Sequence, residues 1–239
     1  MKISVVCPTL NESENVPRLI QELEAVLEGI DYEIVIVDDD SPDRTWAVAE
    51  ELARQDARIR VLRRRGSRSL GWSVIDGFTM AKGDVLACMD ADLQHDPVIL
   101  PKMLQELNNR SDLVVGSRYV SGGSVAGWRW PRRFESWLAT KLAQWIVGIR
   151  ICDPMSGYFL VRRADFLRVR DGLNGQGFKI LLEIAARMRC SHICEVPYTF
   201  RNRAAGKTKL TQRVVFAYMS QLWRLSSWKN RNRRQIVHD

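Results

Sequence analysis

The sequence has 239 residues, 46% of them hydrophobic, a composition typical of a globular protein and not of a disordered chain. Lysine and arginine number 36 against 28 acidic residues, so the net charge of +8 favours anionic partners: nucleic acid, phosphorylated ligands or an acidic membrane surface. The five cysteines form no C-x-x-C pair, which predicts a reducing compartment, and we expect neither a secretory signal nor a segment that spans a bilayer.

Apolar segments alternate in type along the first half of the chain. Short runs predict strands at 2–7, 33–37, 59–62, 85–89 and 112–115, and helical spacing predicts helices at 16–27, 46–53, 71–82 and 99–107. Strands that alternate with helices over residues 1 to about 116 indicate an α/β fold with a mostly parallel, doubly wound sheet. Ligands of such folds bind at the carboxyl ends of the strands, so the residues there are candidate site residues.

Acidic residues follow the second predicted strand directly. Asp38, Asp39 and Asp40 run into Ser41-Pro42-Asp43. Carboxylates at this edge favour hydrogen bonding to a ribose or a base, although Asp and Ser before a helix are also good capping residues. Both interpretations stay open.

The loop at 63–71 follows the third predicted strand and carries four arginines and two glycines. A basic, glycine-bearing loop would suit a pyrophosphate, and a solvated run of charges is equally compatible. Neither the dinucleotide fingerprint nor a phosphate-loop lysine motif occurs, which argues against a nicotinamide enzyme or an ATPase.

The fourth predicted strand ends in Asp90-Ala91-Asp92-Leu93-Gln94. Side chains two residues apart share a face of an extended segment, so Asp90 and Asp92 can contact one hard cation, with Gln94 as a third oxygen ligand. Mg²⁺ or Mn²⁺ held in this way usually completes its shell with water and nucleotide phosphates. Alternatively, Asp92 or Asp96 caps the helix that begins near Pro97.

Four further segments have features that bear on function. Arg118 follows the fifth predicted strand, where it can bind a phosphate in a bidentate manner. Cys190 and Cys194 flank His192, but without a second cluster they indicate a buried strand and not zinc. Aromatic and apolar residues near 132–149 and in the basic extension 213–239 are typical of interfacial helices, and ordinary core faces are the alternative.

Six stretches together resemble one family, the dolichyl- or polyprenyl-phosphate mannosyltransferases of the family-2 glycosyltransferases. The stretches, in colinear order over residues 1–212, are 5–12, 36–43, 90–97, 116–123, 177–183 and 196–203. The resemblance implies a GT-A type nucleotide-diphospho-sugar transferase fold, with a catalytic domain at 1–212 and an amphipathic, basic extension at 213–239. Leu10 stands where tyrosine is usual, and Trp72 where small residues are common.

The resemblance also implies site residues. The nucleotide-sugar positions are Pro8, Leu10, Glu12, Val37, Asp39, Asp90, Ala91, Asp92, Gln94, Arg118 and Arg203. The metal ligands are Asp90, Asp92 and Gln94, and the lipid-phosphate positions are Arg118, Arg132, Ser136, Arg203 and Lys209. Among these, Asp92, Arg118 and Arg203 are the expected catalytic residues.

The function implied is an inverting, Mg²⁺- or Mn²⁺-dependent transfer of mannose from GDP-mannose to dolichyl or polyprenyl monophosphate. The enzyme would work peripherally on the cytoplasmic side of an anionic membrane, with a membrane-anchoring subunit as an optional partner and no nucleic acid. Two alternatives stay open: the same chemistry with UDP-glucose or another nucleotide sugar, and a non-catalytic protein that binds membranes or nucleic acid.

Overall fold

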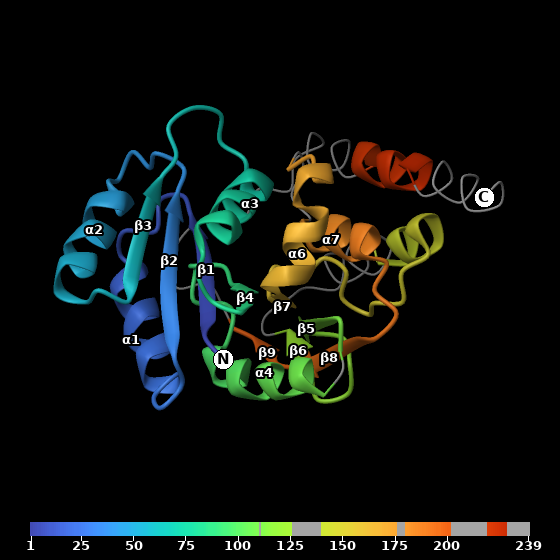
Figure 1. The fold of residues 1–239 in the computed structure, drawn as a ribbon, viewed down its shortest axis with the longest axis horizontal. Helices are drawn as coiled ribbons and strands as arrows, with labels where there is room; N and C mark the ends of the chain where they lie inside the picture. Colours follow the sequence, from blue (N-terminus) through green and yellow to red (C-terminus); the bar gives the residue numbers. More distant parts are fainter. Residues whose placement is uncertain (110, 126–139, 176–179, 202–218, 229–239) are drawn as a thin grey trace.

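The computed structural model describes residues 1–109, 111–125, 140–175, 180–201 and 219–228. These residues form a central sheet with helices on both faces (Figure 1). The predicted α/β class and the alternation of strands and helices are therefore confirmed.

The central sheet has seven strands in the order β3-β2-β1-β4-β7-β5-β8. They are β1 (Ile3–Thr9), β2 (Tyr32–Asp38), β3 (Ile59–Arg63), β4 (Val85–Cys88), β5 (Leu113–Ser117), β7 (Phe159–Arg162) and β8 (Ile193–Pro197). β7 runs antiparallel to both of its neighbours, and the other pairs in this sheet are parallel. A small second sheet pairs β6 (Ser124–Val125) with β9 (Thr199–Phe200).

Helices cover the sheet in two layers. One layer contains α1 (Val16–Val26), α2 (Thr45–Gln55) and α4 (Leu100–Asn108), which follows the short 3₁₀ helix η1 (Pro97–Ile99). The other contains α3 (Leu70–Met80), α6 (Arg163–Val169) and α7 (Ile180–Met188), with the 3₁₀ helix η2 (Arg170–Gly172) after α6. Each helix buries an apolar stripe against the sheet, which is the main source of its stability.

The alternation along β1 shows how the strands divide the core. Val5 and Cys7 face the core under α1 and α4, whereas Val6 between them faces the core under α3. All three side chains are fully buried, as expected for a central strand covered on both faces. β8 lies at the edge of the sheet, so Cys194 is only half-buried, and the prediction of a buried strand there was too strong.

Two helices at 140–147 and 219–228 lie at the opposite end of the molecule from α2 (Figure 1, olive and red). Their apolar faces pack on each other and on α7 through Ala143, Val147, Leu182, Leu222 and Leu225. Among the described residues, the core-face alternative is therefore correct for Leu142, Ile146, Ile149, Leu222 and Leu225, whereas the parts of the two predicted stripes at 132–139 and 213–218 lie outside the described residues. Trp145 and Trp223 differ, because their side chains are 84% and 71% exposed. Within the described ranges, no helix combines the length and apolarity needed to cross a bilayer.

Candidate functional site

One edge of the central sheet collects the predicted site residues. The carboxyl ends of β1, β2, β4, β5 and β8 all reach this edge because these strands run parallel, and β7 begins there because it is reversed. The edge therefore carries Asp39, Asp90, Asp92 and Arg118, together with residues 153–158 that precede β7 and residues 198–201 that follow β8. The predicted placement of these residues at the carboxyl edge is therefore confirmed, and their roles stay predictions.

The predicted metal ligands lie in a tight loop after β4. Asp92 is nearly buried and its Oδ1 accepts the N–H of Gln94 at 3.2 Å, and the Asp90 side chain is 37% exposed. Leu93, between Asp92 and Gln94, has a φ of +62°, a left-handed conformation that turns the chain sharply. Asp96 caps η1 by accepting the N–H of Val98, so the capping alternative holds for Asp96.

Gln94 connects this loop to the strand that follows β8. Its side-chain Nε2 donates to the backbone carbonyl of Arg201 at 3.0 Å. The backbone carbonyl of Gln94 accepts the N–H of Arg201 at 2.9 Å. With the amide nitrogen engaged, the amide oxygen is the atom left for a cation. Two carboxylates and one carboxamide oxygen form a hard donor set, which suits Mg²⁺ or Mn²⁺.

The backbone of Gly157 leaves space for the Asp90 carboxylate. A Cβ atom at position 157 would lie 2.8 Å and 3.0 Å from the two carboxylate oxygens of Asp90, closer than real side chains approach. Only glycine therefore allows the carboxylate to occupy this place without a shift. A carboxylate held against a bare backbone, partly exposed on the ligand-binding edge of the sheet, fits the requirement of a metal ligand.

The three acids after β2 have different surroundings. Asp38 is fully buried and holds the turn by accepting from Thr9 and from the N–H and hydroxyl of Ser41. This carboxylate is structural, but it holds a turn and does not cap α2, whose N-cap is Arg44. Asp39 is also nearly buried, and its oxygens accept from Ser69 N–H at 2.9 Å, Ser73 Oγ at 2.8 Å and the Arg64 guanidinium.

The arginine-bearing loop folds back onto these acids. Arg64 pairs with Asp39 and, at 2.7 Å, with Asp76 of α3. Arg63 pairs with Asp40 and its guanidinium lies 3.7 Å from the centre of the Trp46 ring, while Arg68 donates to the carbonyls of residues 39 and 40. These three arginines are thus engaged by acids and carbonyls and are not a plain solvated run, while the pyrophosphate role of the loop stays a prediction.

Other predicted nucleotide positions lie on the same edge. Pro8 and Val37 are neighbours in the β1–β2 register, and Leu10 just beyond them is 43% exposed. The carboxylate of Glu12 accepts from Asn15 Nδ2 at 2.6 Å, and its N–H donates to Thr45 Oγ1. Ala91, between the two metal-site aspartates, is buried.

Arg118 forms a buried, bidentate ion pair with Asp153. Its Nε and Nη2 donate to the two carboxylate oxygens at 2.7 and 2.8 Å, and its backbone N–H adds a third hydrogen bond at 3.1 Å. Burial alone would lower the pKa of Arg118, but the hydrogen bonds and charge of Asp153 outweigh it and raise the pKa above its usual value. The guanidinium also lies 5.1 Å from the Phe200 ring centre. Arg118 is therefore permanently charged and fixed in direction.

Four predicted lipid-phosphate positions, Arg132, Ser136, Arg203 and Lys209, lie outside the described residues. Arg201 is the last described residue before two of them, and it is firmly attached. Its guanidinium pairs with Glu22 of α1 at 3.0 Å and with Asp96 at 2.8 Å.

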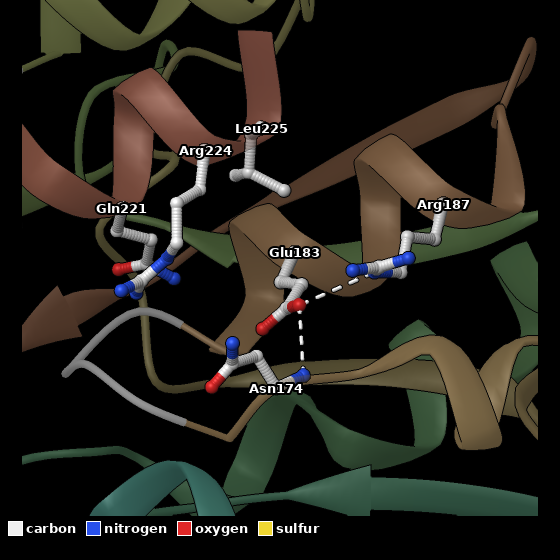
Figure 2. A pocket seen from close by; sticks show the side chains of 6 residues that line it. All are labelled: Asn174, Glu183, Arg187, Gln221, Arg224 and Leu225. Carbon is white, nitrogen blue, oxygen red and sulfur yellow. Dashed lines mark hydrogen bonds and ion pairs between the residues drawn. The ribbon is translucent and has the colours of Figure 1, made fainter. Parts of the chain in front are cut away.

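A separate small cavity of about 40 Å³ lies between α7 and the helix 219–228. Figure 2 shows Glu183 at its centre, with Gln221, Arg224 and Leu225 entering from the neighbouring helix. The buried Glu183 carboxylate accepts from Asn174 N–H at 2.9 Å and pairs with Arg187 at 3.2 Å. The volume is enough for about one water molecule. These contacts give Glu183, part of the 177–183 stretch, a structural role in holding the chain at Asn174 against α7.

Several residues of the site were not identified from the sequence. Asp153, Gly157 and Ser73 lie in segments without a local motif, and Ser69 lies in the arginine-bearing loop without a role of its own, so long-range contacts alone reveal them. His95 and Arg201 belong to the family-like stretches 90–97 and 196–203, so a signal was present but no role was assigned to them.

Comparisons with known proteins agree with this geometry. The model of Glycosyl transferase family 2 matches residues 4–170. The chain is 44% identical to a dolichol-phosphate mannosyltransferase of Pyrococcus furiosus, over 96% of this chain and 65% of that protein. It is 35% identical to a protein of the same name from Saccharomyces cerevisiae, over 96% and 88% of the two chains. An undecaprenyl-phosphate mannosyltransferase of Micrococcus luteus is also 35% identical, over 90% of each chain.

Solved structures support the fold. Glucosyl-3-phosphoglycerate synthase of Mycobacterium tuberculosis, in a complex with Mn²⁺, UDP-glucose and phosphoglyceric acid, has a TM-score of 0.67 at 20% identity, over 92% of this chain and 79% of that one. Mannosyl-3-phosphoglycerate synthase of Rubrobacter xylanophilus has a TM-score of 0.66 at 19% identity, over 94% and 73%. Acidic loops and a fixed arginine lie at one edge of the sheet, and the relatives match most of the length of the chain. The chain therefore belongs to glycosyl transferase family 2, among the dolichol-phosphate and polyprenyl-phosphate mannosyltransferases.

Proposed function

We propose that this glycosyltransferase moves mannose from GDP-mannose to a dolichyl or polyprenyl monophosphate, with Mg²⁺ or Mn²⁺ as cofactor. The observation that carries the proposal is the juxtaposition at one edge of hard oxygen donors, Asp90, Asp92 and Gln94, with the buried cation Arg118. The names of relatives at 35–44% identity support the sugar and the class of acceptor.

In this proposal Asp90, Asp92 and Gln94 hold the cation together with the donor diphosphate. A cation held there would supply positive charge against the diphosphate of the departing nucleotide. Asp92 is nearly buried, so its charge acts at short range with little screening by water. The donor nucleoside would lie over the β1–β2 end of the edge, against Pro8, Leu10, Glu12, Val37 and Asp39.

The nucleophile is an oxygen of the lipid phosphate. This phosphate is largely ionised near neutral pH, so the protein has to place it and does not need a strong general base. Arg118 has a fixed direction and a permanent charge for this task, and Arg132, Ser136, Arg203 and Lys209 are proposed to complete the phosphate site. A single in-line displacement would invert the anomeric carbon, so an α-linked donor gives a β-linked product.

We also propose that the enzyme binds peripherally to the cytoplasmic face of an anionic membrane. The exposed Trp145 and Trp223 support this, since they project from two helices whose opposite faces are already packed on α7. Exposed tryptophan is typical of residues at the membrane–water interface. The basic residues in 229–234 would add attraction to anionic headgroups. A membrane-anchoring subunit remains an optional partner.

The decisive experiment measures transfer of labelled sugar to a short polyprenyl phosphate, with GDP-mannose and UDP-glucose in parallel and with or without Mn²⁺. The proposal expects product from GDP-mannose only, dependent on the metal and lost in Asp92→Ala. Glu106→Ala is a suitable control, since Glu106 is a carboxylate of α4 away from the edge. Product from UDP-glucose alone would keep the mechanism and overturn the donor, whereas lipid binding without turnover would refute the enzymatic proposal.

A further inference from the structure

His95 is a buried histidine in the loop that carries the predicted metal ligands. Its side chain is 2% exposed, and both ring nitrogens lie close to Asp90. Its Nδ1 accepts the backbone N–H of Asp90 at 3.1 Å, and its Nε2 lies 3.7 Å from Oδ2 of the Asp90 carboxylate. Because Nδ1 acts as an acceptor, the proton of the neutral ring is on Nε2, the nitrogen that faces the carboxylate.

Aromatic rings fix the orientation of the imidazole. It is stacked on Tyr158, with ring centres 5.1 Å apart and planes inclined by 20°. Tyr198 and Phe200 contact it edge-on, each with ring centres 5.7 Å away. These three residues come from the start of β7 and from the chain after β8, so the ring is held by parts of the fold outside its own loop. An imidazole enclosed in this way cannot turn without disturbing the core.

The Asp90 carboxylate is therefore confined from two directions. Gly157 approaches so closely that a Cβ there would overlap the carboxylate oxygens, and the Nε2 edge of His95 lies near Oδ2. The hydrogen bond from the Asp90 N–H to His95 also closes the turn that contains Leu93 in its left-handed conformation. His95 thus binds the backbone of Asp90 and lies next to its carboxylate.

We propose that His95 is a positioning residue that holds Asp90 in the orientation needed to bind the divalent cation, an inference that rests on the proposed metal-dependent function. The imidazole is not itself a metal ligand, because Nδ1 is engaged by the backbone and Nε2 carries the proton. Its contribution is to restrict the carboxylate before the metal arrives, as groups around metal ligands commonly do. The affinity for the metal should therefore depend on His95, whereas kcat at saturating metal should not.

A residue that only fills the core would behave differently. His95→Phe retains an aromatic ring of similar size and removes both nitrogens, whereas His95→Asn replaces the ring but offers an amide oxygen close to the position of Nδ1. Tyr158→Phe is a matched control: it preserves the ring under His95 and removes a hydroxyl that donates to the carbonyl of Asp96 at 3.2 Å. If His95 had a purely structural role, its variants would change the stability of the fold and leave the affinity for Mn²⁺ unchanged.

The test uses the full chain, with Mn²⁺ alone and with Mn²⁺ plus GDP, and follows free Mn²⁺ by electron paramagnetic resonance. We expect His95→Phe to raise the dissociation constant of Mn²⁺ about 10–100-fold, His95→Asn to raise it less, and Tyr158→Phe to leave it within about twofold. At saturating Mn²⁺, kcat of the His95 variants should return to within a few-fold of wild type. Unchanged Mn²⁺ affinity in His95→Phe would overturn the proposal.

Nitrogen-15 NMR of the wild-type protein provides a second measurement that requires no variant to fold. The proposal expects the His95 ring to carry its proton on Nε2, and expects this signal to shift when Mg²⁺ is added. A proton on Nδ1 of the neutral ring would overturn it. If wild type bound Mn²⁺ and transferred mannose but His95→Phe bound Mn²⁺ normally, this inference alone would fail. If wild type bound no Mn²⁺, the proposed function would fail first.

Discussion

Arg118 and Asp153 form a bidentate ion pair in which the aspartate is fully buried, and this pair fixes the one described arginine expected to meet the lipid phosphate. We predict that Asp153→Asn lowers the free energy of unfolding by about 3–5 kcal/mol, because it leaves the guanidinium buried without a counter-charge. Urea unfolding measures this loss. Asp171→Asn is the control, since Asp171 pairs with Arg170 but is 85% exposed and should change stability by less than about 0.5 kcal/mol. Equal effects would contradict the assignment.

Gly157→Ala should separate the metal site from the stability of the fold. The new Cβ would meet the Asp90 carboxylate, which is the end of a side chain and can move away. We therefore expect Mn²⁺ binding and sugar transfer to fall at least tenfold, a size typical of disturbed groups around a metal ligand, with little change in melting temperature. Calorimetric Mn²⁺ titration and thermal melting check the two parts. A variant that melts early but binds Mn²⁺ normally would show that Gly157 serves only the fold.

Arg64 should affect donor binding through Asp39. Arg64→Ala removes one of the groups that hold this nearly buried carboxylate, and we predict a loss of about 1–3 kcal/mol in stability together with a higher KM for GDP-mannose. Initial rates against donor concentration give KM and kcat separately. Arg65→Ala in the same loop is exposed and is the matched control. If both variants had the same KM as wild type, Asp39 would not need Arg64 to serve the donor.

The exposed side chains of Trp145 and Trp223 predict membrane binding. Trp145→Ala and Trp223→Ala should each weaken partition to vesicles that contain anionic lipid by about tenfold, because each removes apolar surface that the membrane would cover. Co-sedimentation with vesicles of neutral and anionic composition measures this. Val98→Ala, which removes another exposed apolar side chain at η1, should leave partition unchanged. A loss as large in that control would argue against a specific membrane face.

Glu33 predicts how stability depends on pH. Burial alone would raise the pKa of this carboxyl, but hydrogen bonds from Ser4, the Lys82 N–H and Arg60 outweigh it and lower the pKa below its ordinary value. A carboxyl with a lowered folded-state pKa stabilises the protein above its unfolded pKa of about 4.3, and this stabilisation is lost as the pH falls through the folded-state pKa. Unfolding from pH 7 to pH 3 should show a drop below about pH 4 that Glu33→Gln reduces. An equally steep drop in the variant would exclude this cause.

Local patterns predicted the first part of the fold well. Runs such as Ile34 to Val37 lie between turn signals, so their strands were found to within one or two residues at each end. β7 could not be predicted in this way, because its three apolar residues before Arg162 are too few to distinguish strand from helix. β7 also occupies a place between β4 and β5 that no local pattern indicates.

The loop from Asp90 to Gln94 could be predicted as a candidate site, because oxygen-bearing side chains recur there at every second position. The partners that fix these residues were not, because they come from distant segments: Asp153 lies 35 positions from Arg118, and Arg201 lies 107 positions from Gln94. The partners of the arginine-rich loop were missed for a related reason. Arg63 and Arg64 pair with acids at the end of the neighbouring strand, which the local charge pattern does not indicate.

The reversed direction of β7 has a consequence for the order in which the protein matures. During synthesis, β4 and β5 emerge with Asp90 and Arg118, yet these strands do not pair with each other, and the place between them is filled only when residues 159–162 arrive. Asp153 and Gly157, which fix Arg118 and Asp90, are delivered by the same segment. A nascent chain that ends before residue 153 therefore contains Asp90 and Arg118 without the residues that fix them, and the edge is complete only when residues 198–201 follow β8 and contact Gln94 and His95.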